Sequence, residues 1–258
     1  MKYFVWDANP IAFSFGSMHV FWYGILFATA ILLGLEFMKW VYRTEKRDDK
    51  ELETLFIYIV IGIVVGARLG HCFFYDPAYY LAHPMKIFAV WEGGLASHGG
   101  GLGVILALAL YCKKYKVSFL WLLDRIAIAT ALFGFFVRMG NFMNSEIIGK
   151  PTEVPWAVIF LRVDALPRHP TQLYEAFSYL IIFFILAYIY KRREKLNRGF
   201  LFGLFLILIF TVRFIVEFVK TKQADYTLNI GLTTGQLLSI PFLILGVFLI
   251  FYSIKKRD

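Results

Sequence analysis

Long apolar runs separated by short polar links dominate the pattern of the 258-residue chain. A helix that crosses a bilayer needs about 20 consecutive, mostly apolar residues. Seven runs are long enough, and we expect each to form a transmembrane helix. They lie near 17–40, 52–72, 93–112, 117–137, 172–190, 200–219 and 235–254. The third begins with Gly93, Gly94 and Gly99–Gly101, so we expect an irregular start there.

Composition supports a membrane protein over a soluble one. Hydrophobic residues make up 59% of the chain and charged residues only 17%, whereas soluble domains average about 45–50% apolar and about 25% charged residues. A chain with this composition has too few polar residues to cover the surface of a water-soluble fold. It is therefore suited to the lipid environment of a bilayer. We therefore predict an all-α integral membrane protein of about seven transmembrane helices, forming a single membrane-embedded domain over 1–258.

Basic residues predict the orientation. The links 41–50, 113–116, 191–199 and 255–258 hold 15 Lys and Arg in 27 positions, whereas 1–16, 73–92, 138–171 and 220–234 hold 8 in 85. Because retained loops are strongly basic on the cytoplasmic side, we expect the N-terminus outside and the C-terminus inside. This topology also explains the net charge of +9, so no nucleic-acid partner is expected.

Two cysteines, Cys72 and Cys112, fall near opposite faces of the membrane in this topology. The faces are about 30 Å apart, whereas a disulfide needs Cα atoms within about 7 Å. We expect two unpaired thiols.

Two external segments are longer than simple connectors. Residues 73–92 are aromatic, and we expect them to lie along the interface. Residues 138–171 are rich in Pro, Gly and Asn and are expected to form a small extracytoplasmic head.

Ionisable residues inside a span are costly and usually functional. Arg213 lies about 9 Å deep in the sixth span, and Glu217 follows at the i,i+4 spacing that lets two helical side chains meet. The pair can be a structural lock between helices or part of an anion site. Asp124 and Arg125, in the inner half of the fourth span, are interpreted as structural partners.

Further polar residues converge on the outer level of the membrane. Any one of them alone fits an interfacial position, but together with Arg213 and Glu217 they come from five spans, which favours a site. They are Tyr23, His98, Arg138, Asn141, Asn144, Glu146, Gln172, Tyr174 and Glu175.

The residue types favour a phosphate ligand. Arginine binds phosphate through a planar fork and stays charged, histidine can take a proton near neutral pH, and glycines allow close backbone approach. A lipase-type esterase would need a G-x-S-x-G elbow, which is absent. The five histidines lack zinc-ligand spacing, and no nucleotide-binding fingerprint occurs, so no metal or cofactor is expected.

Five motifs in order resemble the prolipoprotein diacylglyceryl transferase family. Arg138-Met-Gly-Asn-Phe-Met-Asn-Ser-Glu146 is similar to the signature R-x-G-N-F-x-N-x-E. The other four are Trp22-Tyr-Gly24, His98-Gly-Gly-Gly-Leu-Gly103, His169-Pro-Thr-Gln-Leu-Tyr-Glu175 and Arg213-Phe-x-x-Glu217-Phe218. They run from 22 to 218. Val137 and Lys220 are mild departures, since the family often has Gly and Arg there.

The resemblance implies an enzyme of bacterial lipoprotein biosynthesis in the inner, or cytoplasmic, membrane. It implies transfer of the sn-1,2-diacylglyceryl group of phosphatidylglycerol to the lipobox cysteine that follows a prolipoprotein signal peptide. A thioether forms and glycerol phosphate leaves. The expected partners are phosphatidylglycerol, the prolipoprotein and the bilayer, with the active site at the extracytoplasmic face.

The resemblance also suggests roles for single residues. His98, Arg138, Arg213 and Tyr23 are the catalytic candidates, of which the two arginines hold the phosphate. Arg138, Asn141, Glu146, Gly149, Arg213 and Glu217 are the candidates for binding phosphatidylglycerol. The base for the thiol stays open between His98, Tyr23 and no base at all, since a positive potential can lower a thiol pKa unaided.

Two other classes of protein are alternatives. A transporter or lipid flippase usually has repeats and mid-membrane helix breaks, and neither is evident here. A purely structural or assembly protein would tolerate changes of His98 and of both arginines.

Overall fold

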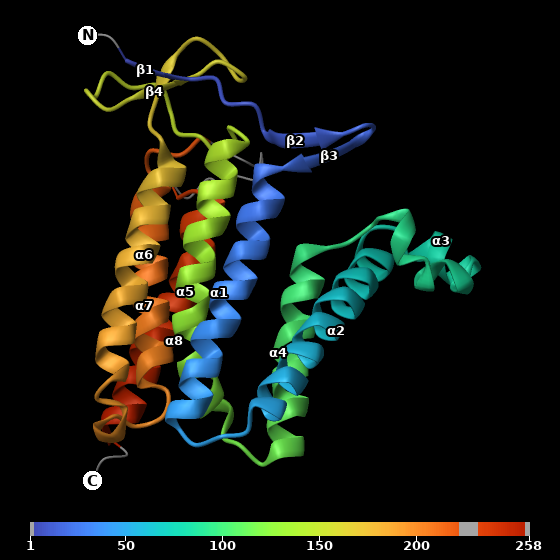
Figure 1. Cartoon of the computed structure of the whole chain (residues 1–258), viewed down its shortest axis with the longest axis vertical. Helices are drawn as coiled ribbons and strands as arrows, with labels where there is room; N and C mark the ends of the chain where they lie inside the picture. Colours follow the sequence, from blue (N-terminus) through green and yellow to red (C-terminus); the bar gives the residue numbers. More distant parts are fainter. Residues whose placement is uncertain (1–2, 222–231, 256–258) are drawn as a thin grey trace. The chain divides into compact units, whose positions relative to one another are not determined.

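The computed structural model describes residues 3–221 and 232–255, and most of this chain is helical (Figure 1). Long helices lie at all seven predicted places. They are α1 (Trp22–Thr44), α2 (Asp49–Phe74), α4 (Ser97–Tyr115), α5 (Phe119–Met143), α6 (Thr171–Tyr190), α7 (Phe200–Val216) and α8 (Thr234–Lys255). The segments 220–234 and 255–258 that entered the charge comparison lie mostly outside the described residues.

Five of these helices are long and apolar enough to cross a membrane: α1, α2, α5, α6 and α8. α7 is apolar but shorter, and α4 opens with the weakly hydrophobic residues Ser97–Gly101. The chain is thus a mostly helical, multi-pass membrane protein. The number of seven spans and the orientation stay predictions.

The chain divides into two compact units. The bundle unit comprises Met1–Met38 and Leu123–Asp258, and the hairpin unit comprises Lys39–Leu122. The prediction of one catalytic domain over 1–258 stays a prediction.

A small sheet forms the head of the bundle unit. β1 (Phe4–Trp6) pairs in parallel with β4 (Val158–Phe160), which pairs antiparallel with β5 (Pro167–Arg168). Its core contains Phe142, Ile148, Val158 and Phe160, and Trp6 packs against it. The predicted head of 138–171 therefore shares its first residues with α5, and it takes in a strand from the N-terminus that the sequence pattern did not indicate.

A hairpin precedes α1 and corrects the predicted start of the first span. β2 (Ile11–Phe15) and β3 (Met18–Phe21) pair antiparallel, and Gly16 makes the turn at φ 58°. Backbone hydrogen bonds to β2 hold Met18–Phe21 as a strand, so the helix begins at Trp22 rather than near 17.

Buried polar contacts brace the bundle unit far from the head. Asp124 is 2% exposed, and its carboxylate accepts hydrogen bonds from the backbone N–H groups of Gly199 and Phe202 at 2.7 and 2.8 Å. These groups belong to the start of α7, whose free N–H groups favour an anion. The contacts agree with the predicted structural role of Asp124.

Glycines let α2 and α4 pack closely in the hairpin unit. A Cβ added at Gly62 would lie 2.6 Å from the Gly103 carbonyl oxygen, and one at Gly70 would lie 2.8 Å from Gly99 Cα. Such contacts leave no room for a side chain, so the two backbones themselves form the crossing. Cys72 and Cys112 are buried and unpaired, as predicted.

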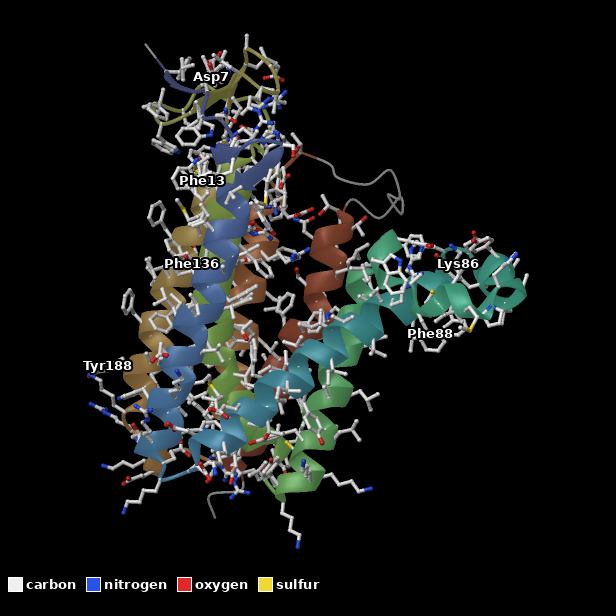
Figure 2. The ribbon with its side chains drawn as sticks, turned by 45° about the vertical axis from the view of Figure 1, so that its right-hand side comes forward. Asp7, Phe13, Lys86, Phe88, Phe136 and Tyr188 are labelled. Carbon is white, nitrogen blue, oxygen red and sulfur yellow. The ribbon has the colours of Figure 1, made fainter. Side chains whose placement is uncertain are left out.

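A lobe of short helices joins α2 to α4. It contains α3 (Pro77–Ala82), the 3₁₀ turn η1 (Pro84–Phe88), which carries Lys86 and Phe88 (Figure 2), and η2 (Val90–Glu92). Arg68 of α2 is 3% exposed and donates to the carbonyls of Lys86, Ile87, Gly93 and Gly94. Gly93 and Gly94 have φ of 85° and 71°, which confirms the irregular start of the third run.

Candidate active site

The signature residues at the end of α5 form a connected polar chain. The Arg138 guanidinium donates to Asn141 Oδ1 at 3.2 Å, and Asn141 Nδ2 donates to Glu146 Oε2 at 3.1 Å. Asn144 donates to the other oxygen of Glu146, also at 3.1 Å. Glu146 thus acts on Arg138 through Asn141, and it is itself exposed.

A tight reversal after α5 makes this arrangement possible. The helix ends at Met143, and Ser145 and Ile147 both have φ of 56°. The backbone N–H of Glu146 donates to the Asn141 carbonyl at 2.9 Å. This turn brings the Glu146 carboxylate back to the helix that carries Arg138.

The motif His169–Glu175, at the start of α6, supports the loop 146–149. Gln172 is fully buried and donates to the Glu146 carbonyl at 2.5 Å, and Thr171 donates to the Ile147 carbonyl at 2.7 Å. His169 Nδ1 lies 3.1 Å from the Tyr174 hydroxyl, and burial lowers the pKa of His169. These side chains hold the backbone of the site in place.

Glu175 is the centre of the charged cluster. Its side chain is 0% exposed, and its two oxygens lie 2.8 Å from Arg138 Nε and 3.0 Å from Lys220 Nζ. A buried carboxylate needs such partners, because an unpaired buried charge is strongly destabilising. The pair with Glu175 engages Nε of Arg138 and the bond to Asn141 engages Nη1, which leaves further N–H donors of the five for a ligand.

Lys220 completes this cluster at the end of α7. It is 4% exposed, and its ammonium also lies 3.8 Å from Glu217. Burial lowers the pKa of Lys220, although the Glu175 carboxylate acts in the opposite direction. Sequence reasoning counted Glu175 among the outer-level polar residues but gave it no role, and it treated Lys220 only as a departure from the family motif. The signals were Glu175 at the end of the motif His169–Glu175 and Lys220 as the departure just after the motif Arg213–Phe218.

Gly149 lies where three backbone segments meet. It pairs with Lys220 in an antiparallel bridge, and its N–H donates to the His169 carbonyl at 2.9 Å. A Cβ here would lie 2.5 Å from His169 Cβ and 2.8 Å from the Val219 carbonyl oxygen. A side chain at position 149 would prevent these backbone segments from packing together, so the position requires glycine.

Arg213 and Glu217 do not pair as their spacing suggested. α7 ends at Val216, so Glu217 lies in the turn that follows. A Cβ added at Gly235 would lie 2.5 Å from the Glu217 carboxyl carbon, which places that carboxylate at the start of α8. Within residues 3–221 and 232–255, the Arg213 guanidinium forms no ion pair or hydrogen bond.

Tyr179 of α6 lies beside the segment of α5 that carries Arg138. Tyr179 is 6% exposed. Tyr179 lies one turn beyond Glu175, and its ring packs against Gly134 of α5. Arg138 and Arg213 both belong to the bundle unit, and sequence reasoning did not single out Tyr179.

The remaining candidates come from two elements. Tyr23 of α1 packs its ring against Gly140, where an added Cβ would lie 2.7 Å from Tyr23 Cδ2, so Tyr23 lies beside the helix segment of Arg138. His98 lies in the hairpin unit, in the first turn of α4, with its side chain exposed.

Helices of membrane-spanning length and a buried cluster of cations and carboxylates define a polytopic membrane protein with a polar centre. Comparison with known proteins then identifies its family. The profile of the prolipoprotein diacylglyceryl transferase family matches residues 10–252. The chain belongs to this family, and it is a transferase of bacterial lipoprotein biosynthesis.

Similar proteins match over nearly their whole length. The phosphatidylglycerol–prolipoprotein diacylglyceryl transferase of Tolumonas auensis is 53% identical, over 98% of both chains. A protein of the same name from Chloroherpeton thalassium is 50% identical, over 100% of this chain and 97% of its own. Another from Bacteroides fragilis is 47% identical, over 98% and 96%.

Proposed function

We propose that this protein transfers the sn-1,2-diacylglyceryl group of phosphatidylglycerol to the lipobox cysteine of a prolipoprotein. The names of its relatives give both substrates. We further propose that it acts in the bacterial inner membrane with its site at the extracytoplasmic face. That face is where the cysteine of an exported precursor emerges from the membrane.

The reaction replaces a carbon–oxygen bond by a carbon–sulfur bond. The cysteine sulfur attacks the glyceryl carbon that carries the phosphate, and a thioether forms. The bond from this carbon to the phosphate oxygen breaks, and its electron pair leaves with glycerol phosphate. The thiol proton goes to a base or to water. Because the leaving group gains negative charge, fixed cations beside it lower the barrier.

The observation that supports this proposal is the set of contacts that the two arginines make. Arg138 is anchored by Glu175 and Asn141 with donors to spare, and Arg213 is free of partners among the described residues. Both belong to the bundle unit, and we infer that one phosphate engages both. Anchoring through a neutralising carboxylate fixes the position of Arg138 before the lipid arrives, which favours catalysis over mere binding.

The base for the thiol remains open between three possibilities. His98 is exposed at the first turn of α4, and histidine is the side chain that most often serves as a general base. Tyr23 lies beside the helix of Arg138. The third possibility is no base, since nearby cations lower a thiol pKa by themselves.

The main test uses the purified protein, phosphatidylglycerol and a lipobox peptide. We expect a mass gain that equals one diacylglyceryl group and that is lost when the peptide cysteine is replaced by serine. Arg138→Ala and Arg213→Ala should each lower the rate at least about a hundredfold, as loss of a donor to a developing charge does. Mass spectrometry of the peptide provides the measurement.

Arg198→Ala is the matched control, because Arg198 is exposed in the link between α6 and α7. It should keep the full rate. Full activity in both Arg138→Ala and Arg213→Ala would refute the phosphate role. Lipid movement between leaflets without any peptide modification would favour the transporter alternative.

A pH profile distinguishes the candidate bases. If His98 is the base, His98→Gln should slow the reaction at pH 7 and regain rate as pH rises toward about 8.5, where a free thiol ionises unaided. If the pH profile of His98→Gln equals that of the unmodified enzyme, the base is Tyr23 or the reaction uses no base. Tyr23→Phe, measured over the same pH range, separates these two.

A further inference from the structure

An apolar trough runs between α2 and α4 on the surface of the hairpin unit. Its volume is about 660 Å³, within the range of about 300–1,000 Å³ that is typical of small-molecule sites. Tyr58 is its only lining residue with a polar side chain, and none is charged. The trough lies wholly within one unit, and the roles assigned to the charged cluster do not involve it.

Two ridges of exposed apolar side chains form its walls. On α2 the ridge starts at Ile57 and repeats at every fourth residue to Phe73. On α4 it consists of Leu102, Leu106 and Leu110. Between them the glycines of the helix crossing make a floor of bare backbone. Ile57 to Phe73 spans about 24 Å of helix, more than the roughly 15 Å depth of one leaflet.

The two ends of the trough differ. His98 lies one turn before Leu102, at the first turn of α4, and Gly99 lines the trough beside it. Ala96 at the N-cap provides no side-chain cap, and a helix N-terminus attracts negative charge. The His98 end therefore suits an anionic or ester group, whereas the body of the trough suits hydrocarbon.

Tyr58 lines the opposite end of the trough. Its ring lies 6.2 Å from that of Tyr111, a fully buried residue, and the Lys114 ammonium lies 5.7 Å from its centroid. These contacts hold the Tyr58 ring in place. A chain that enters from the His98 end thus meets a fixed aromatic stop.

We propose that the trough binds one acyl chain of the donor phospholipid, with the glyceryl end at His98 and the terminal methyl group toward Tyr58. Lipid amphiphilicity matches the trough, whose charge-free body leads to an end that suits an anion. A chain held in this way has a preferred length, so the trough sets the acyl-chain preference of the enzyme. This inference rests on the proposed transfer reaction.

The test compares phosphatidylglycerol donors that differ in chain length by two methylene groups per step. Leu106→Trp places bulk in the trough and should shift the preference to shorter chains. Donors whose chains exceed the shortened trough should lose kcat/KM relative to shorter donors. Tyr58→Ala removes the stop and should shift the preference to longer chains. The two opposite shifts are the expected result.

Ile105→Trp is the matched control. Ile105 is 57% exposed, close to the 61% of Leu106, but it does not line the trough. Its chain-length profile should equal that of the unmodified enzyme. An unmoved profile in both Leu106→Trp and Tyr58→Ala overturns the inference, as does an equal shift in Ile105→Trp. If Leu106→Trp does not fold, Tyr58→Ala decides alone.

Two further outcomes are separable. If the unmodified protein transfers nothing, the proposed function fails, whereas an active enzyme with unmoved profiles counts against the trough alone. If Leu106→Trp instead dissociates a dimer and leaves the chain-length profile unchanged, the trough binds a second copy of this chain and the inference is wrong.

Discussion

At the residue scale, the cluster around Glu175 explains why a cation is needed at position 220. One buried carboxylate serves both Arg138 and Lys220. Without Lys220, Glu175 would compete with the lipid phosphate for Arg138 more strongly, and its charge would be only half compensated. Lys220 is thus a positioning residue, which acts on the phosphate site through Glu175.

The lowered pKa of Lys220 gives this role a pH signature. As pH rises through that pKa, the ammonium loses its charge and Glu175 loses a cation, so activity should fall at a pH below the ordinary lysine value of about 10.4. Lys220→Arg keeps its charge, so the alkaline fall should move to higher pH. Rates from pH 7 to the alkaline limit measure the shift.

The other charged groups of the cluster are Arg138, Glu175 and Glu217, and they are the same in both proteins. Only the residue at 220 therefore accounts for a difference between the profiles. Lys220→Met, which is uncharged throughout, should be impaired at every pH. Identical alkaline limbs for the unmodified enzyme and Lys220→Arg would contradict the positioning role.

The sequence predicted which residues belong to the candidate site better than it predicted which residues they contact. Arg138, Asn141 and Glu146 form the connected chain that their motif suggested. Arg213 and Glu217 form no ion pair among the described residues although the backbone stays helical through Glu217, because the Glu217 carboxylate lies against Gly235 of α8 instead. Glu175 joins Arg138 to Lys220 only through contacts between α5, α6 and the end of α7, which no local pattern contains.

At the scale of elements, helices were predictable and strands were not. Long apolar runs locate α2, α5 and α6 within a few residues, because a membrane span has to be long and apolar. β1 and β4 have three residues each, and each depends on a partner distant in the sequence. Such short strands leave no periodic signal.

The crossing of α2 and α4 makes a sharp prediction for two glycines of one helix. A Cβ at Gly103 would collide with the Gly62 carbonyl, so Gly103→Ala should force the helices apart and lower the melting temperature and folded yield. Gly101 has nothing within 4 Å of an added Cβ. Gly101→Ala should be neutral or stabilising by up to about 1 kcal/mol.

Thermal unfolding in detergent measures both variants. Equal stability of Gly103→Ala and Gly101→Ala would show that the backbones are not in contact at this crossing. Because the same crossing forms the floor of the trough, Gly103→Ala should also disturb acyl-chain preference, whereas Gly101→Ala should not.

At the scale of the whole molecule, strand pairing bears on the topology. β1 precedes α1 and β4 follows α5, yet they share a sheet, so both lie on the same side of the membrane. An even number of crossings must separate them. Since α1, α2 and α5 alone would give an odd number, the pairing favours α4 as a further span, in line with seven.

Orientation can be tested with two single cysteines. Val163 is exposed in the head, and Arg198 is exposed in the link between α6 and α7. In spheroplasts, a membrane-impermeant maleimide should label Val163→Cys but label Arg198→Cys only after lysis. Native Cys72 and Cys112 are buried, so the background should be low. The reverse pattern would invert the predicted topology.

The parallel pairing of β1 with β4 also sets an order of events during biosynthesis. Phe4–Trp6 leave the ribosome first, but the strand that receives them is made only after α5. The head can close only late, once both segments have been exported, and until then the N-terminal strand waits with open backbone groups. A bulky fusion placed directly before Phe4 would therefore interfere with maturation of the nascent enzyme more than one appended after α8.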